Sequence, residues 1–285
     1  MMAIAAIFVT FFLFVILGLP IALSLVLGSV VPLSLFGNVP LFSLVQKMFT
    51  AIDSYSLLAL PFFMIAGGLM DKGGVSRRLI DFAKSLVGWM PGGLAVVTFV
   101  ASAFFGAICG SASATVVAIG SITIPAMLRE KYPLPFVLAT SASAGWLGIV
   151  IPPSIPMVLY GISGNVSVGS VFMGGFIPGI ALTFAMSLYA IWYGKKHLSD
   201  NLIKFSLREV GRTFVGAIGA LIMPVIILGG IYGGVFSPTE AAAVACLYGI
   251  IIGMFIYKEL SFKDLVRVFR NSIQTSSMIL FIIAT

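Results

Sequence analysis

The feature that most constrains the fold is a succession of apolar runs, about 15 to 28 residues long, that lack the alternation of a half-buried strand. In hydrocarbon every backbone N–H and C=O has to be hydrogen-bonded within the protein, so such runs must be helices rather than strands of a barrel. Only 9% of the residues are charged, against about 25% in soluble domains. The sequence therefore predicts an all-α integral membrane protein.

The distribution of charge predicts the orientation. Every basic residue except Lys47 falls in a loop that the predicted crossings place on one side, and the positive-inside rule assigns that side to the cytoplasm. This explains the net charge of +7 without a nucleic-acid partner. Near Gly18 and Pro20 we expect a bend, which leaves open two short crossings or one bent crossing. The expected crossings are residues 2–17, 20–35, 55–70, 134–161, 168–193, 215–232 and 239–257, with two shorter arms at 94–110 and 113–128.

Three amphipathic stretches lie in or near the loops, at residues 43–52, 75–90 and 264–273. An amphipathic helix of this kind is typical of a segment lying along the membrane surface. The alternative is a helix that packs on a polar face of the protein itself.

An internal repeat is indicated by residues 44–60, which align without a gap on residues 265–281 with four identities. The predicted topology runs the two copies through the bilayer in opposite directions, as in inverted-repeat transporters. We therefore expect residues 1–218 to hold the first repeat and residues 219–285 to begin the second. By the repeat logic, roughly 130 further residues would complete it.

A re-entrant hairpin is predicted at about residues 94–128. Its turn, from Cys109 to Ser121, consists of glycines, small hydroxyls and apolar residues without a charge. Each arm reaches about 25 Å, slightly short of a hydrocarbon core of about 30 Å. Such irregular backbone is tolerated only where it is buried or lines a cavity. The alternative is an ordinary pair of short crossings with a small external turn.

A broken helix is predicted at residues 134–161, where Pro152 and Pro153 interrupt the crossing. Prolines cannot donate backbone N–H groups, so carbonyls around Gly148, Ile149 and Ile151 are left free. Counted from the cytoplasmic ends, the two breaks lie at similar depths of about 21 and 24 Å, so they should meet. A helix that is merely kinked for structural reasons is the alternative.

The two breaks together predict a site for a small cation and an anion. Free carbonyls and neighbouring hydroxyls form a hard-oxygen cage, and helices that restart beyond each break offer N–H groups to an anion. Proton-coupled carriers typically place Asp, Glu or His inside the membrane, whereas the nine carboxylates here lie at or near predicted helix ends. Sodium is therefore the expected ion, with no organic cofactor. The expected ligands are Ser111, Ser113, Gly148, Ile151 and Pro153 for Na⁺ and Ser111, Ser113, Thr115 and Ser154 for the solute.

Two other classes of function fit the sequence less well. An anion channel would need a continuous polar pathway, whereas the polar residues form one local cluster. An intramembrane protease would need a Ser close to a His or Lys, or paired Asp residues, and no predicted crossing supplies either arrangement. Another ion-coupled secondary carrier remains the main alternative.

At Gly233–Ala245 the second repeat carries GGVFSPTEAAAVA. Ser237 or Thr239 could cap the helix that begins near Glu240, and the alanines permit close packing. The alternative makes Glu240 a contact for a partner or a periplasmic gate.

This motif, together with GSASATVVAIGSITIPAM, GWLGIVIPPSIPMVLYG and FIPG, closely resembles the large membrane subunit (M subunit, DctM-like) of TRAP transporters, the tripartite ATP-independent periplasmic carriers. The resemblance covers the whole chain. It implies a fold of the ion-transporter superfamily and an elevator-type, sodium-coupled importer of organic acids such as C4-dicarboxylates, sialic acid or other sugar acids. It also implies a multi-pass protein of the bacterial inner membrane, whose partners are a small four-helix membrane subunit and a periplasmic solute-binding protein. A second hairpin and second sodium site, expected of the family, would lie beyond residue 285.

Overall fold

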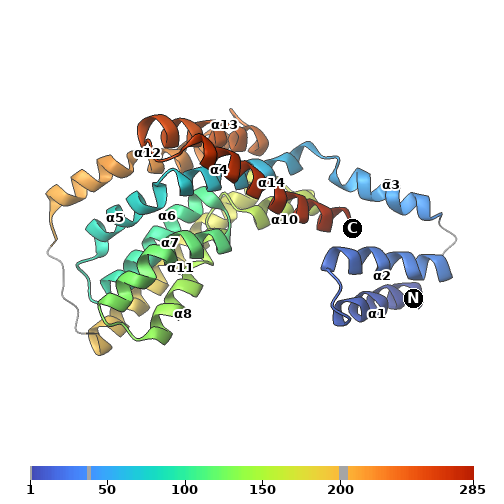
Figure 1. Ribbon diagram of the computed structural model, residues 1–285, viewed down its shortest axis with the longest axis horizontal. Coiled ribbons are helices and arrows are strands. Elements are labelled where there is room, and N and C mark those ends of the chain that lie inside the picture. The colour runs from blue at the N-terminus through green and yellow to red at the C-terminus, as the bar shows by residue number, and fades with distance from the viewer. Residues whose placement is uncertain (1, 37–39, 199–204) are drawn as a thin grey trace. The chain divides into compact units, whose positions relative to one another are not determined.

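A computed structural model describes residues 2–36, 40–198 and 205–285, and these segments are helical, without a strand among them (Figure 1). The chain divides into two compact units, residues 1–57 with 273–285 and residues 58–272. Among the described residues, four helices are long and apolar enough to cross a membrane, or up to six if each of two bent helix pairs counts as one crossing. The prediction of an all-α chain with interrupted helices is confirmed for the described residues.

The first unit begins with two helices packed as a hairpin, α1 (Met2–Ile16) and α2 (Ile21–Phe36). Gly18 turns the chain with a φ of +83°, so the expected bend is present as a break between separate helices. Thr10 Oγ1 donates a hydrogen bond to the carbonyl of Gly28 at 3.0 Å. Helix α3 (Leu41–Ile52) follows, and none of its residues is buried.

The second unit is built around α6, which contacts α4, α5, α7, α8, α9, α11 and α12. The boundaries of α6 and α7 lie within one residue of the predicted arms. A π-helical turn, η2, follows α13, and α14 continues into the residues of the first unit. The elements are η1 (Tyr55–Leu58), α4 (Ala59–Lys72), α5 (Val75–Val87), α6 (Gly93–Cys109), α7 (Ala112–Arg129), α8 (Leu134–Ala144), α9 (Leu147–Val150), α10 (Ile155–Ser163), α11 (Val168–His197), α12 (Leu207–Tyr232), α13 (Pro238–Ile251), η2 (Ile252–Ile256) and α14 (Phe262–Ala284).

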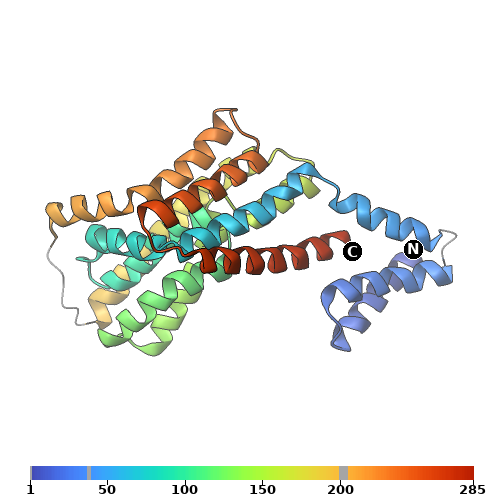
Figure 2. The same cartoon turned by 45° about the horizontal axis from the view of Figure 1, so that its top comes forward.

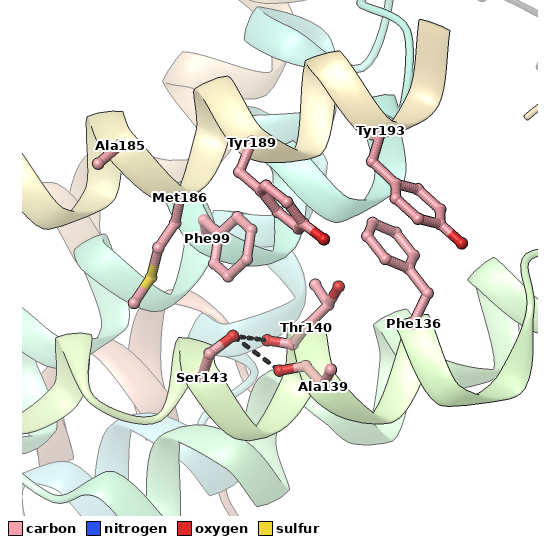
Figure 3. A pocket seen from close by; sticks show the side chains of 9 residues that line it. All are labelled: Phe99, Phe136, Ala139, Thr140, Ser143, Ala185, Met186, Tyr189 and Tyr193. Atoms are coloured by element: carbon pink, nitrogen blue, oxygen red, sulfur yellow. Dashed lines mark hydrogen bonds between the residues drawn. The ribbon is translucent and has the colours of Figure 1, made fainter. Parts of the chain in front are cut away.

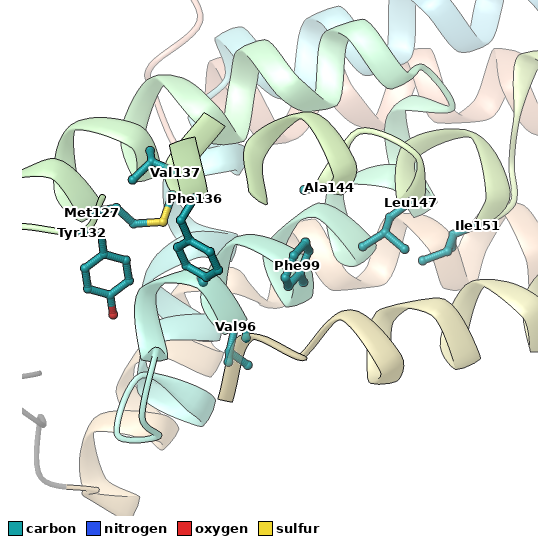
Figure 4. Packing of buried hydrophobic residues seen from close by; sticks show 11 residues of the cluster. Val96, Phe99, Met127, Tyr132, Phe136, Val137, Ala144, Leu147 and Ile151 are labelled. Carbon is teal, nitrogen blue, oxygen red and sulfur yellow. The ribbon is translucent and has the colours of Figure 1, made fainter. Parts of the chain in front are cut away.

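The core of this unit lies where α6, α8 and α9 meet. Phe99 from α6, Phe136 from α8 and Leu147 from α9 are buried together, and Ile151 continues the row (Figure 4). On another side of the unit, α13 packs against α4 and α12 (Figure 2). Burial of large apolar side chains around α6 therefore holds both interrupted segments in place.

The amphipathic stretches differ in their surroundings. Residues 75–87 form α5, whose apolar side chains, such as Leu79 and Phe82, are buried next to α6 and α12. Helix α5 therefore packs on apolar side chains such as Phe104 and Phe214, rather than on a polar face of the protein, and its location along the membrane surface stays a prediction. Within its own unit α3 leaves Phe42 and Phe49 exposed. Residues 264–273 are part of the continuous helix α14, in which Val268 is buried.

Candidate functional site

The first interruption is a tight turn between α6 and α7. Gly110 ends α6 with a φ of +66°, a left-handed conformation that glycine adopts without a steric penalty. Ser111 then caps α7, because its hydroxyl accepts a hydrogen bond from the backbone N–H of Ala114 at 3.5 Å. Two residues thus reverse the chain, as a helical hairpin requires.

The second interruption separates α9 from α10. Residues 134–150 and 155–163 are bent by 42° at this break. Pro152 and Pro153 lack the N–H groups that would reach the carbonyls of Gly148 and Ile149 in a continuous helix. The break therefore supplies carbonyl oxygens that no helical N–H can satisfy.

The two breaks meet, as the sequence predicted. The backbone N–H of Ile155 donates a hydrogen bond to the carbonyl of Gly110 at 3.2 Å, which joins the start of α10 to the hairpin turn. A Cβ atom added to Gly110 would lie 2.7 Å from the carbonyl oxygen of Pro153. A Cβ added to Gly148 would collide with the hydroxyl of Thr115 and lie 2.8 Å from the carbonyl oxygen of Ser111. Only glycines permit this approach.

The predicted hydroxyls occupy different environments. Thr115 is fully buried and donates to the carbonyl of Ser111 at 2.8 Å. Ser111 is half-buried, and its hydroxyl lies 3.3 Å from that of Ser113, which is exposed at the start of α7. Ser154 is 1% exposed, and its hydroxyl has no hydrogen-bond partner among the described residues. The unengaged hydroxyl of Ser154 can donate to an anionic solute, and the proline-freed carbonyls beside it are neutral oxygens that suit a small cation.

Not every predicted site residue contributes its side chain to this junction. Ile151 points toward α11, where it packs against Gly179 and lines a separate apolar pocket of about 410 Å³. Only its backbone carbonyl is therefore suited to bind an ion.

The second break rests on a part of α11 that was not among the predicted site residues. A Cβ added to Gly175 would lie 2.7 Å from the carbonyl of Val150, and one added to Gly179 would meet Ile151. On α6, a Cβ added to Gly106 would lie 2.7 Å from the carbonyl of Leu147. The spacing of Gly175 and Gly179, with three residues between them, is typical of close helix packing in membranes and could have revealed this contact.

The residues of the two breaks, 109–115 and 147–155, carry no charged side chain. Arg78 pairs with Glu259 at 2.6 Å and stacks 3.8 Å above the ring of Tyr257. Across the described ranges, no group of three or more His, Cys, Asp or Glu residues could hold a metal ion. Neutral oxygens are therefore the groups that the junction offers.

The start of α13 shows the predicted cap. The N–H of Ser237 donates to the carboxylate of Glu240 at 2.7 Å, and the N–H of Glu240 donates to the hydroxyl of Ser237 at 3.3 Å. This reciprocal pair is a capping box. The structural interpretation of this motif is confirmed.

Comparison with known proteins extends over nearly the whole chain. Residues 8–285 match the family described as tripartite ATP-independent periplasmic transporter, DctM component. The chain is 43% identical to the isethionate TRAP transporter permease protein DctMQ of Oleidesulfovibrio alaskensis, over 96% of this chain and 43% of that protein. It is 45% identical to the C4-dicarboxylate TRAP transporter large permease protein DctM of Vibrio cholerae, over 91% of this chain and 57% of the relative.

The sialic acid TRAP transporter large permease protein SiaM of Vibrio cholerae is 36% identical, over 92% of this chain and 61% of the relative. The chain thus spans less than two thirds of the length of these curated relatives. The family match covers residues 8–285. The two joined breaks contain the GSASATVVAIGS and IPPSIP segments, which also indicate this family. The chain belongs to the DctM-component family of tripartite ATP-independent periplasmic (TRAP) transporters.

Proposed function

We propose that the protein containing this chain is the large permease subunit of a sodium-coupled importer of organic acids in the bacterial inner membrane. The names of its relatives, which include permeases for isethionate, C4-dicarboxylates and sialic acid, support an organic anion as the solute. The apolar helices support a multi-pass membrane location. The protein is a carrier in this proposal, and it performs no covalent chemistry.

The observation that carries the proposal is the junction of the two breaks. Sodium would be held by the carbonyls of Gly148, Ile151 and Pro153 together with the hydroxyls of Ser111 and Ser113. The solute would contact the hydroxyls of Ser111, Ser113 and Ser154 at the two helix starts, where backbone N–H groups favour an anion. Thr115, also proposed for the solute, would have to give up its hydrogen bond to the carbonyl of Ser111 to donate to an anion. Buried Ser154, without a partner of its own, is the hydroxyl best prepared for a ligand.

The proposed architecture is an elevator-type inverted repeat, with residues 1–218 as the first repeat and residues 219–285 as the start of the second. A small four-helix membrane subunit and a periplasmic solute-binding protein would complete the transporter. In the matched segments, residues 44–60 contain a gap in the helix at Asp53 and Ser54, whereas residues 265–281 are continuous within α14.

The experiment is uptake of labelled isethionate, succinate and sialic acid into proteoliposomes that contain the full-length protein and its partners. We expect uptake of one of these acids to require an inward sodium gradient. Ser154→Ala should reduce the sodium-dependent rate, while Ser187→Ala, which removes another buried hydroxyl without a partner among the described residues, should leave it unchanged. Uptake independent of sodium, or electrical conductance without a gradient requirement, would refute the proposal.

A further inference from the structure

A second feature of the larger unit lies apart from the joined breaks. A pocket of about 580 Å³ opens between α8 and α11 (Figure 3). This volume is in the range of about 300–1,000 Å³ that is usual for sites that bind small molecules. The side chains that form it include Phe99 from α6, Phe136 and Thr140 from α8, and Met186, Tyr189 and Tyr193 from α11.

The walls of this pocket favour an apolar occupant. Ser143, which also lines it, donates its hydroxyl to the carbonyls of Ala139 and Thr140 at 2.7 and 3.1 Å, so its hydrogen is already engaged (Figure 3). The remaining surface comes mainly from aromatic rings and from Met186. A hydrocarbon chain fits these walls better than a carboxylate does, because the pocket side chains carry no positive charge.

An aromatic stack leads from the pocket toward the C-terminal end of α11. The rings of Phe136 and Tyr193 lie parallel with centroids 4.0 Å apart, and His197 stacks on Tyr193 at 4.5 Å. Tyr132 lies two residues before α8, and its ring centroid is 6.2 Å from that of Phe136. Aromatic rings in this position are typical of the boundary between hydrocarbon and headgroups.

Basic side chains follow immediately beyond the aromatic stack. Lys195 and Lys196 are exposed in the last turn of α11, and the ammonium group of Lys196 lies 5.4 Å from the ring of Trp192. Arg129 and Lys131, also exposed, lie in the turn that precedes Tyr132. The positive-inside rule assigns this end to the cytoplasmic leaflet, where anionic lipid headgroups attract Lys and Arg.

We propose that this pocket binds one anionic phospholipid of the cytoplasmic leaflet, with an acyl chain between α8 and α11 and its phosphate beside Lys195, Lys196 and Lys131. Along α11 the apolar pocket is followed by aromatic rings and then by lysines. A phospholipid has its acyl chain, glycerol and phosphate in the corresponding order. Charge complementarity selects an anionic headgroup over a zwitterionic one. The proposal needs no sodium coupling, so it stands or falls separately from the transport mechanism.

The test is native mass spectrometry of the full-length protein titrated with phosphatidylglycerol or phosphatidylcholine of the same acyl chains. We expect one tightly retained phosphatidylglycerol. Lys195→Gln with Lys196→Gln should weaken its binding about thirty-fold, from the attraction expected for two basic residues. Arg208→Gln with Lys263→Gln, which removes the same charge from two other exposed positions, should change binding little.

A second test fills the pocket with a larger side chain. Ala185→Phe places a ring among the lining residues and, by excluding as few as two methylene groups, should weaken binding about ten-fold. Ala181→Phe, one turn away on the same helix and likewise exposed, is the matched control. Equal retention of both lipids, or no effect of either test variant, would overturn the proposal. So would a wild-type protein that retains no lipid because its remaining chain covers the pocket.

Discussion

Replacing Gly110 by alanine tests the junction of the two breaks directly. The φ of +66° at this position costs an alanine about 1–2 kcal/mol. The new Cβ would lie 2.7 Å from the carbonyl oxygen of Pro153, and relieving that contact adds about 1–3 kcal/mol, as for overpacking in a core. We therefore expect Gly110→Ala to lower the free energy of unfolding by about 2–5 kcal/mol.

The matched control is Gly234→Ala. Gly234 has a similar φ of +69°, but a Cβ added there would have nothing within 4 Å. This variant should show the conformational cost alone, about 1–2 kcal/mol. The difference between the two variants therefore measures how closely the hairpin turn approaches the second break.

The assay is equilibrium unfolding of the full-length protein in mixed detergent micelles, with and without sodium. With sodium bound as we propose, Gly110→Ala should also reduce the stabilisation expected from the ion, because separating Gly110 from Pro153 pulls the carbonyls and hydroxyls apart. Gly234→Ala should leave that stabilisation intact. If both variants unfold alike and respond alike to sodium, the two breaks are not packed together as described.

Three further predictions concern other contacts. Gly175→Ala should destabilise the protein and weaken the proposed sodium binding, because the new Cβ meets the carbonyl of Val150. Gly174→Ala should be neutral or slightly stabilising, because a Cβ added there has nothing within 4 Å. Equal unfolding midpoints of the two variants would contradict this prediction. Ser237→Ala should lower the free energy of unfolding by about 1 kcal/mol, because it removes the helix cap, while uptake is retained. Ser237→Asp should recover most of this stability. Lost uptake at unchanged stability would instead favour a gating role for this turn. The cation–π contact of Arg78 with the ring of Tyr257 can be measured by a double-mutant cycle of Arg78→Ala with Tyr257→Leu. Unfolding curves should give a coupling energy of about 0.5–1 kcal/mol, and no coupling would mean that this contact contributes nothing to stability.

Short stretches of sequence were sufficient to predict the two helix interruptions. The sequence predicts the turn between α6 and α7 because glycines and small hydroxyls without a charge separate two short apolar arms. The left-handed Gly110 and the Ser111 cap are the local structure that forms this turn. The break after α9 was found because Pro152 and Pro153 remove two backbone donors in a row. Similar depth in the membrane then sufficed to predict that the breaks meet, since rise per residue is nearly constant in helices.

The orientations of side chains could not be predicted in the same way. The exposure of Ser113 and the direction of Ile151 depend on how the helices are rotated against their neighbours, which depth alone does not determine. The amphipathic pattern of α5 likewise gives an apolar face but does not say whether lipid or protein covers it. Contacts between distant segments decide these features.

The π-helical turn at the end of α13 has a consequence for the two tyrosines on either side of it. Tyr248 and Tyr257 both donate their hydroxyls to α12, to the carbonyls of Gly219 and Gly216 at 2.8 and 3.0 Å. Nine positions along a regular α-helix amount to about two and a half turns, which would aim these rings in opposite directions. The π-turn accommodates one additional residue and so brings both rings to the same side. A regular α-helix over the same residues would swing Tyr257 away from α12, whereas a one-residue deletion within Ile252–Ile256 would leave about 2.2 turns of regular helix between the tyrosines and keep both rings on one side.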